Sequence, residues 1–529
     1  WLSGRGIKAK FKLEHFKNME TVDRLPINGF MKIWIYEHFV VGMCSWVLLI
    51  HDFNHDFIDT QITSPTGVFL KKWAGLFKSA EVGTLYRSKA KFGLGLMSLT
   101  LAFEKQQITK CHLLKNSPDP HITDLYKARE KREHAETGRI WRPTPLLARV
   151  ESMVEHDLKY QHAAPGDRRG LGHGLFVSSD PTPAEHRALC GKATATLRSE
   201  KLAAHSHSLA MQGVWTNWWE KTASFDFTWD NLIYGPGPLV LSFVLNAAVN
   251  SLPTPDQLKL LGYKVSGLCG LCGERATQHH ILVNCKKALN DKRYTWRHDS
   301  VLATLLQAIQ PALVQHNKSP PPPPKPPAIN QSFKPVGSAP RYNRGNAPSS
   351  IKPQLSSLLG SASDWKLLVD FDQMKILFPV HIASTNQRPD IILWSDSLRL
   401  VILVELTCPA EEGIEAAGVR KQARYLPLKE AIEGEKRKYG WKVHVLTIES
   451  GARGFVANST HSFLRKIGFT SQNARKICHD VSEVTARCSY GIFLMHNEKC
   501  WNSSRELVVP DSDNYIKPPP LHIHPDLSY

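Results

Sequence analysis

The sequence predicts a multidomain fold with a mainly α-helical N-terminal half and an α/β C-terminal domain built on a central mixed sheet. Its 529 residues exceed what one hydrophobic core usually spans. Before residue 316, apolar, aromatic and basic residues recur at helical spacing, whereas after about 355 aliphatic runs alternate with charged helical stretches. Five consecutive prolines at 320–324 lie between these two regions and favour an extended linker.

These changes in composition divide the chain into five predicted segments. Ser117-Pro118-Asp119-Pro120 interrupts a helical pattern, and a glycine-rich turn follows at 166–172. We expect a helical domain at 1–135, a helical connector at 136–262, a Cys/His-rich segment with basic and aromatic residues at 263–315, a disordered proline-rich linker at 316–354, and an α/β domain at 355–529.

The charge of the chain favours polyanionic partners. It has 66 Lys and Arg against 48 Asp and Glu, a formal net charge of +18. Such a balance promotes phosphate contacts and counterion release, so nucleic acid is the first partner to consider. The alternative is an ordinary basic surface without a specific partner.

Uninterrupted apolar runs are short, and the longest are pieces such as 401–404. We therefore expect no membrane-spanning helix, no membrane partner and a soluble protein. Ten cysteines are scattered over the chain, and only three fall close together, so a disulfide framework is not expected and a reducing compartment fits better.

The clustered cysteines form the pattern Cys-x2-Cys-x7-His-x4-Cys, which supplies three thiolates and one imidazole within seventeen residues. This is the ligand set of a closed tetrahedral zinc site, here Cys269, Cys272, His280 and Cys285. Neighbouring glycines, at 267, 270 and 273, allow a tight backbone path around the first pair. His279 competes with His280 on spacing alone, and a redox Cys-x2-Cys pair is the alternative use of the first two cysteines.

Cations and aromatic residues alternate just after this motif, as they do in surfaces that contact phosphates and stack on bases. The candidate nucleic-acid-binding residues are Arg293, Trp296, Arg297 and His298. A solvated helix with Trp296 buried against the preceding motif is the equally weighted alternative.

Two acidic residues mark a candidate catalytic site in the α/β domain. Asp390 opens a strand-like run, a turn follows near Asp396 or Ser397, and a second strand over 399–406 contains Glu405. If the two strands form a hairpin, Asp390 lies opposite residues 403–405, so the two carboxylates could lie side by side. A divalent cation, Mg²⁺ or Mn²⁺, would compensate their charge and could assist phosphodiester hydrolysis. A turn-capping Asp and an unrelated Glu are the alternative.

Hydrolysis at such a site also benefits from a cation near the attacking water. A helix is predicted over 411–429, and its Lys421 and Lys429 are candidates for that role. Exposed helices carry such charges routinely, which is the competing interpretation.

Together these residues resemble the C-terminal portion of non-LTR retrotransposon reverse transcriptases that carry a restriction-like endonuclease of the PD-(D/E)XK superfamily. The resemblance rests on the Cys/His motif, Leu252-Pro253-Thr254 before it, the string 293–299 after it, and the Arg388-Pro389-Asp390 motif followed by Glu405. It implies a thumb-like domain at 1–135, a zinc knuckle that uses His280, and a restriction-endonuclease-like domain at 355–529. It also implies a role for Asp370 as an upstream acidic metal ligand.

Two departures limit this resemblance. No Tyr/Phe-x-Asp-Asp polymerase motif is present, so DNA synthesis is not expected and the polymerase palm would lie upstream in a full-length polyprotein. Thr407 stands where the simplest Glu-x-Lys arrangement has lysine, which implies a lysine moved to the following helix.

The leading functional hypothesis is a metal-dependent endonuclease that nicks target DNA for target-primed reverse transcription, with DNA and element RNA as partners. Its expected location is the nucleus, because the substrate is chromosomal, with the cytoplasm as the alternative. A catalytically inactive nucleic-acid-binding or scaffold remnant is the competing hypothesis. A decayed reading frame is a third, since the chain starts at Trp1 and lacks a palm.

Overall fold

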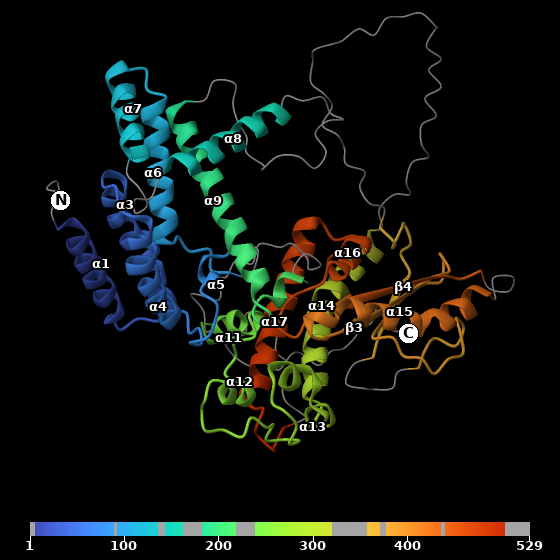
Figure 1. Ribbon diagram of the computed structural model, residues 1–529. Helices are drawn as coiled ribbons and strands as arrows, with labels where there is room; N and C mark the ends of the chain where they lie inside the picture. The colour runs from blue at the N-terminus through green and yellow to red at the C-terminus, as the bar shows by residue number, and fades with distance from the viewer. Residues whose placement is uncertain are drawn as a thin grey trace, which may run out of the picture. The chain divides into compact units, whose positions relative to one another are not determined.

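The computed structural model describes residues 6–88, 93–135, 143–161, 182–217, 238–319, 357–370, 377–434 and 440–502 (Figure 1). Most of the predicted proline-rich linker, the glycine-rich turn at 166–172 and the residues from 503 onward lie outside these ranges. The described residues form two compact units, one that ends at Pro253 and one that begins at Thr254.

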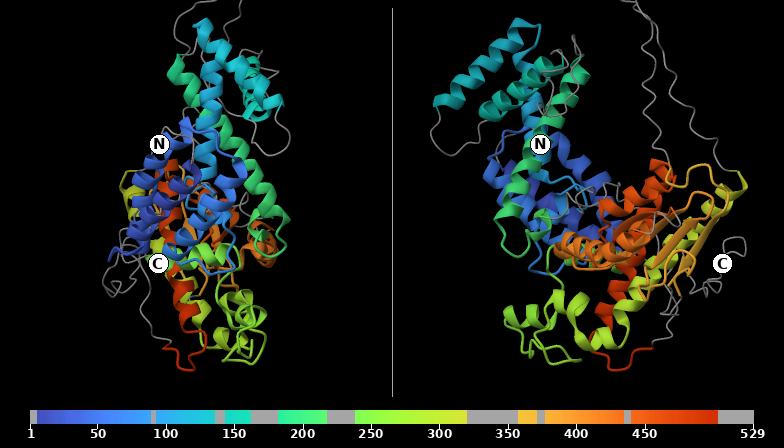
Figure 2. Two further views of the ribbon diagram at one scale, coloured as in Figure 1. Left: turned by 60° about the vertical axis from the view of Figure 1, so that its left-hand side comes forward. Right: turned by 90° about the vertical axis from the view of Figure 1, so that its right-hand side faces the viewer.

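Every regular element described in the first unit is a helix, as predicted for this half of the chain. Helix α6 is central, because it packs against α3, α7, α8 and α9 (Figures 1 and 2). The elements are α1 (Ile7–Asp23), α2 (Gly29–Ile35), η1 (Tyr36–Val40), α3 (Val41–Ile50), η2 (Phe57–Thr63), α4 (Ser64–Trp73), α5 (Gly83–Tyr86), α6 (Leu99–Lys115), α7 (Pro120–Ala135), α8 (Pro143–Gln161), α9 (Pro183–Ser208), η5 (Val214–Asn217) and α11 (Pro238–Ala248).

Large apolar side chains from several of these helices meet in one buried cluster. Phe11, Leu48, Ile62 and Phe103 come from α1, α3, η2 and α6 and are almost fully buried. Burying a side chain of this size stabilises the fold by about 1.5–3 kcal/mol relative to exposure. The cluster therefore holds together helices that are distant in the sequence.

One segment departs from the expectation that no helix could span a membrane. Gly29–Ile50 is 22 residues long, has a mean hydropathy of 1.7, and is long and apolar enough to cross a membrane by length and composition. The expectation counted only uninterrupted apolar runs, whereas polar residues such as Lys32, Glu37 and His38 interrupt this segment. Core helices pass the same test, and Ile33, Cys44 and Leu48 of this segment are buried within the first unit.

The second unit begins with short elements around the Cys/His motif and continues into a long helix. These elements are α12 (Pro255–Leu260), η7 (His280–Asn284), α13 (Lys286–Asn290) and α14 (Arg293–Lys318). Helix α14 extends through 316–318, which the sequence assigned to the linker. The side-chain amide of Asn317 explains this extension, because it exchanges hydrogen bonds of 2.8 and 3.1 Å with the backbone of Trp365.

A four-stranded mixed sheet follows, with β1 (Trp365–Val369), β2 (Ile391–Ser395), β3 (Leu400–Thr407) and β4 (Lys442–Glu449) in that spatial order. The first three strands pair antiparallel, and β3 pairs parallel with β4. A parallel pair needs a crossover, and here η8 (Glu411–Gly413) and α15 (Ile414–Gly434) supply it. Helices α16 (Asn458–Lys466) and α17 (Ser471–Leu494) complete the described unit.

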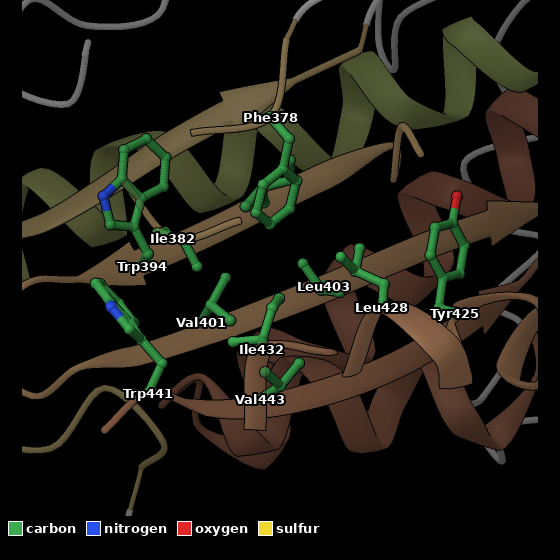
Figure 3. Close-up of a cluster of buried hydrophobic side chains, with 11 residues drawn as sticks. Phe378, Ile382, Trp394, Val401, Leu403, Tyr425, Leu428, Ile432, Trp441 and Val443 are labelled. Carbon is green, nitrogen blue, oxygen red and sulfur yellow. The ribbon is translucent and has the colours of Figure 1, made fainter. Parts of the chain in front are cut away.

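Both faces of the sheet are covered, since every residue of β2 is buried. On one face Leu403 and Val443 pack against Tyr425, Leu428 and Ile432 of α15 (Figure 3). Helix α14 contacts β1 and β3 and packs along α17, and it passes on the far side of the strands in Figure 3. Continuous aliphatic runs in β2 and β3 are what such two-sided burial requires.

The mainly helical composition and the mixed sheet that the sequence predicts are therefore confirmed. The division into five segments and the restriction-endonuclease-like character of the α/β part remain predictions.

A buried ion pair joins the start of the crossover to the chain after β4. The guanidinium of Arg453 donates to Glu411 at 2.7 Å and to Glu412 at 2.9 Å, and its backbone N–H also donates to Glu411. Burial raises the pKa of Glu411, and Arg453 opposes that shift by stabilising the carboxylate. This contact anchors the N-terminal end of the segment that carries Lys421.

Replacing Arg453 with Leu is expected to destabilise the second unit by about 3–5 kcal/mol, because it leaves the Glu411 carboxylate buried without its partner. Hydrogen exchange of the full chain, followed by mass spectrometry of peptides from β4, measures this loss of stability as reduced protection. Arg475→Leu, at an exposed position of α17, is the control. It should change the stability inferred from exchange by less than about 0.5 kcal/mol. Equal protection of β4 in both variants would show that the ion pair does not stabilise the unit.

Candidate functional site

The Cys/His motif folds into one compact group of potential metal ligands. The four ligand atoms of Cys269, Cys272, His280 and Cys285 lie within 4.8 Å of one another. Cys285 Sγ lies 3.9 Å from Cys269 Sγ and 3.7 Å from Cys272 Sγ, and His280 Nε2 lies 3.2 Å from Cys272 Sγ. Sulfur ligands at about 2.3 Å from a tetrahedral ion would be about 3.8 Å apart, so the group could hold a metal ion.

The geometry decides between the two adjacent histidines. His280 is buried and points its Nε2 into the group, whereas His279 is exposed. Burial lowers the pKa of His280, which favours the neutral imidazole that binds metals. Burial raises the pKa of the Cys285 thiol to about 11, so a nearby cation would be needed to keep it as thiolate.

Local backbone geometry explains how the ligands converge. Gly267 and Gly273 have φ of 75° and 77°, in the left-handed region that favours glycine. Gly270 does not share this conformation, although a Cβ there would meet Asn497 Oδ1 at 2.8 Å. The N–H of Cys285 donates to the hydroxyl of Tyr294 at 3.0 Å, which secures the last ligand.

The two predicted acidic residues lie on adjacent strands at the same level. Ile391 pairs with Val404, so the antiparallel register places Asp390 directly opposite Glu405. Asp390 Oδ2 also accepts a hydrogen bond of 2.7 Å from the N–H of Leu406. The hairpin geometry expected from the sequence thus brings the two carboxylates together at the open end of β2 and β3.

A third carboxylate, that of Asp370, follows β1, the strand next to β2. We call Asp370, Asp390 and Glu405 together the acidic row. Val369 pairs with Ile391, so Asp370 follows opposite Asp390, and its N–H donates to the carbonyl of Asp390 at 3.0 Å. The guanidinium of Arg388 lies 3.8 Å from Asp370 Oδ2. Residues opposite one another in a sheet point to the same face, so the register places Asp370, Asp390 and Glu405 on the face covered by α15.

Helix α15 brings two polar side chains to Glu405. The ammonium of Lys421 forms an ion pair with Glu405 Oε1, and the hydroxyl of Tyr425 donates to Oε2 at 2.7 Å. Their i, i+4 spacing puts both on one face of the helix. Lys429 lies about 12 Å further along the helix axis. It is near His444 on β4, whose pKa is lowered by burial and further by the charge of Lys429. Of the two candidate lysines, the structure brings Lys421 to the acidic residues.

Several opposing effects act on the pKa of Glu405 in the acidic row. Its exposure is 4%. Burial raises its pKa, the charge of Asp390 raises it further, and Lys421 and Tyr425 oppose both effects. A cation placed between the carboxylates would lower the pKa of Glu405 in the same way as Lys421 does.

The four predicted nucleic-acid-binding residues lie at the start of α14, and three of them are buried. Arg293 and Arg297 are 0% and 1% exposed, and Trp296 is 7% exposed. Arg293 donates to the carbonyls of Met495 and Glu498 at 2.6 Å, within the second unit. These positions favour the packing alternative for Trp296, and they place the two arginines in internal contacts rather than on a solvated helix face.

His298, the fourth of these residues, lies instead at the acidic row. Its Nε2 is 3.4 Å from Asp390 Oδ2 and its Nδ1 is 2.9 Å from Asp299 Oδ1. Burial acts to lower the pKa of His298, but the hydrogen bonds to Asp299 and Asp390 raise it well above its ordinary value. Sequence reasoning missed this contact, because nothing in the spacing shows that α14 reaches the sheet.

The chain matches no known protein family and no curated protein sequence. Its chemistry is therefore inferred from two arrangements of its own side chains. One is a soft Cys/His group suited to a structural metal ion, and the other is a row of three carboxylates with one lysine. Hard divalent cations prefer the second kind of ligand.

Cobalt binding should distinguish the two histidines. The wild-type chain and His279→Ala are expected to show the visible absorption of tetrahedral, thiolate-ligated Co²⁺, while His280→Ala should bind it more weakly and with an altered spectrum. The reason is that His280→Ala removes one of four ligands that converge. Identical spectra and affinities for His280→Ala and wild type would rule out His280 as a ligand.

Proposed function

We propose that this chain is the C-terminal portion of a retrotransposon reverse transcriptase, whose second unit is a metal-dependent endonuclease that nicks target DNA. The observation that carries this proposal is the row of Asp370, Asp390 and Glu405 on three adjacent strands, with Lys421 paired to Glu405. This row supplies hard oxygen ligands and an adjacent cation at one place, as metal-assisted phosphodiester hydrolysis uses them.

Each side chain has a role in this scheme. Asp390 and Glu405 hold the divalent cation, Mg²⁺ or Mn²⁺, and Asp370 adds a third carboxylate. When bound, that cation polarises the scissile phosphate and lowers the pKa of an attacking water. Lys421 stabilises the anionic form of Glu405. Its ammonium lies next to the acidic row, where it can orient that water. Tyr425 holds the second oxygen of Glu405 in place.

The Cys/His group completes the proposal as a zinc knuckle. Three cysteine sulfurs and one imidazole nitrogen that lie within 4.8 Å of one another suit Zn²⁺ in a closed structural site. The formal charge of +18 supports binding to DNA and element RNA through phosphate contacts. Action on chromosomal DNA implies a nuclear location, and the polymerase palm would belong to an upstream part of the same polyprotein.

A catalytically inactive nucleic-acid-binding remnant is the second candidate. The observation that favours it is the Lys421–Glu405 ion pair, which already neutralises one of the proposed metal ligands. Thr407 in place of a lysine two residues after Glu405 agrees with this candidate. Salt-sensitive DNA binding without any metal-dependent cleavage would identify it.

Plasmid nicking by the full chain in Mg²⁺ or Mn²⁺ tests the proposal. Asp390→Asn and Glu405→Gln keep side-chain size and remove a ligand charge, so each is expected to lower the nicking rate at least about 100-fold, which corresponds to about 2.7 kcal/mol. Lys421→Met should also lose activity, whereas Lys429→Met is the matched control and should keep it. Nicking that persists in Asp390→Asn would reject the acidic row as the active site.

A further inference from the structure

The first turns of α14 reach the acidic row, although 46 residues of chain, 319–364, separate the end of this helix from β1. His298 Nε2 lies 3.4 Å from Asp390 Oδ2, and His298 Nδ1 lies 2.9 Å from Asp299 Oδ1. Two carboxylates thus hold one imidazole between them. Asp299 is 7% exposed, and the His298 side chain is 23% exposed, so the contact is largely shielded from solvent.

The neighbouring Arg297 fixes this part of α14 against the rest of the second unit. Its guanidinium donates to the carbonyl of Leu282 at 3.0 Å and to Ser489 Oγ at 3.0 Å. The guanidinium also donates to the carbonyl of Cys408, three residues after Glu405, at 3.2 Å. One buried side chain therefore ties α14 to the Cys/His motif, to α17 and to the chain that leaves β3.

We propose that His298, oriented by Asp299, is a positioning residue of the nuclease site that sets the orientation of the Asp390 carboxylate. This inference rests on the proposed metal-binding role of Asp390. If His298 has this role, the site combines residues that come before and after the proline-rich segment in the sequence. Helix α14 precedes that segment, and the acidic row follows it.

The contacts of Asp390 show how this positioning works. The N–H of Leu406 and the imidazole of His298 both meet the same oxygen, Oδ2. Two contacts to one oxygen restrict the rotation of the carboxylate. With His298 removed, the Leu406 contact alone would hold Asp390, and the carboxylate could turn away. Partners that orient metal ligands in this way typically change metal affinity about 10–100-fold when they are replaced.

The experiment measures Mn²⁺ binding to the full chain without DNA, by electron paramagnetic resonance, after the Cys/His group has been saturated with Zn²⁺. His298→Gln is expected to weaken Mn²⁺ binding about 10–100-fold. Asp299→Asn keeps an acceptor for the ring N–H but removes the negative charge, so a smaller decrease in Mn²⁺ affinity is expected. Because it is milder, this variant still tests the proposal if His298→Gln does not fold.

His381→Gln is the matched control, since His381 Nε2 also contacts a carboxylate, Asp396 Oδ1, at 3.1 Å, beside the turn at the other end of the β2–β3 hairpin. It should bind Mn²⁺ like the wild type. Nicking assays supply a second readout. For His298→Gln, the Mn²⁺ concentration at half-maximal rate should rise, while excess Mn²⁺ restores much of the maximal rate. A purely structural role would lower the rate at every concentration.

The outcomes separate this inference from the proposed function. Wild-type Mn²⁺ affinity in His298→Gln, together with lost affinity in Asp390→Asn, would overturn the positioning role and leave the nuclease site intact. Weakened metal-free DNA binding with unchanged Mn²⁺ affinity would instead make His298 a nucleic-acid contact. No Mn²⁺ binding to the wild-type chain would overturn the proposed function, and the inference with it.

Discussion

The constraint at the centre of the second unit is a pair of carboxylates, Asp390 and Glu405, that lie beside each other where β2 begins and β3 ends. Glu405 is nearly inaccessible to solvent, and its register partner Asp390 adds a like charge. Such a pair is unfavourable unless positive charge or hydrogen-bond donors surround it. Lys421, Tyr425, His298 and the N–H of Leu406 are the groups that the structure supplies. These groups come from three segments, α15, α14 and β3, which meet at this row.

Helix α14 is the element that unites these segments. Its first turns contact the Cys/His motif through Tyr294 and Arg297, and its last turn pairs with the backbone of β1 through Asn317. The metal-ligand group and the acidic row therefore belong to one compact unit. The buried side chain of Arg297 contacts both the Cys/His motif and the carbonyl of Cys408, and its neighbour His298 contacts Asp390.

Local sequence patterns predicted the parts of the site that depend on short-range geometry. The predicted hairpin placed Asp390 opposite residues 403–405, and the observed register pairs it with Glu405 within that range. The ligand group follows from cysteine spacing. The helix after β3 was also predicted, and its i, i+4 spacing could have shown that Lys421 and Tyr425 share a face. Lys429, eight residues on, could not be excluded by charge alone.

Long-range packing was not accessible from the sequence in the same way. The basic and aromatic string 293–299 has the composition of a nucleic-acid surface, yet Arg293 and Arg297 are buried because carbonyls distant in the sequence accept their hydrogen bonds. The apolar segment Gly29–Ile50 is a different case, because its mean hydropathy can be calculated from the sequence once interruptions by polar residues are allowed. The acceptors of Arg293 and Arg297, by contrast, are known only from the fold.

The most direct test of the central claim is a crystal structure of the Zn²⁺-loaded chain soaked in Mn²⁺, with the cation located by its anomalous scattering. We expect a peak bound by carboxylate oxygens of Asp390 and Glu405, with the Lys421 ammonium moved away from Glu405. An acidic row that stays without an anomalous peak at saturating Mn²⁺, with Lys421 still paired to Glu405, would contradict it.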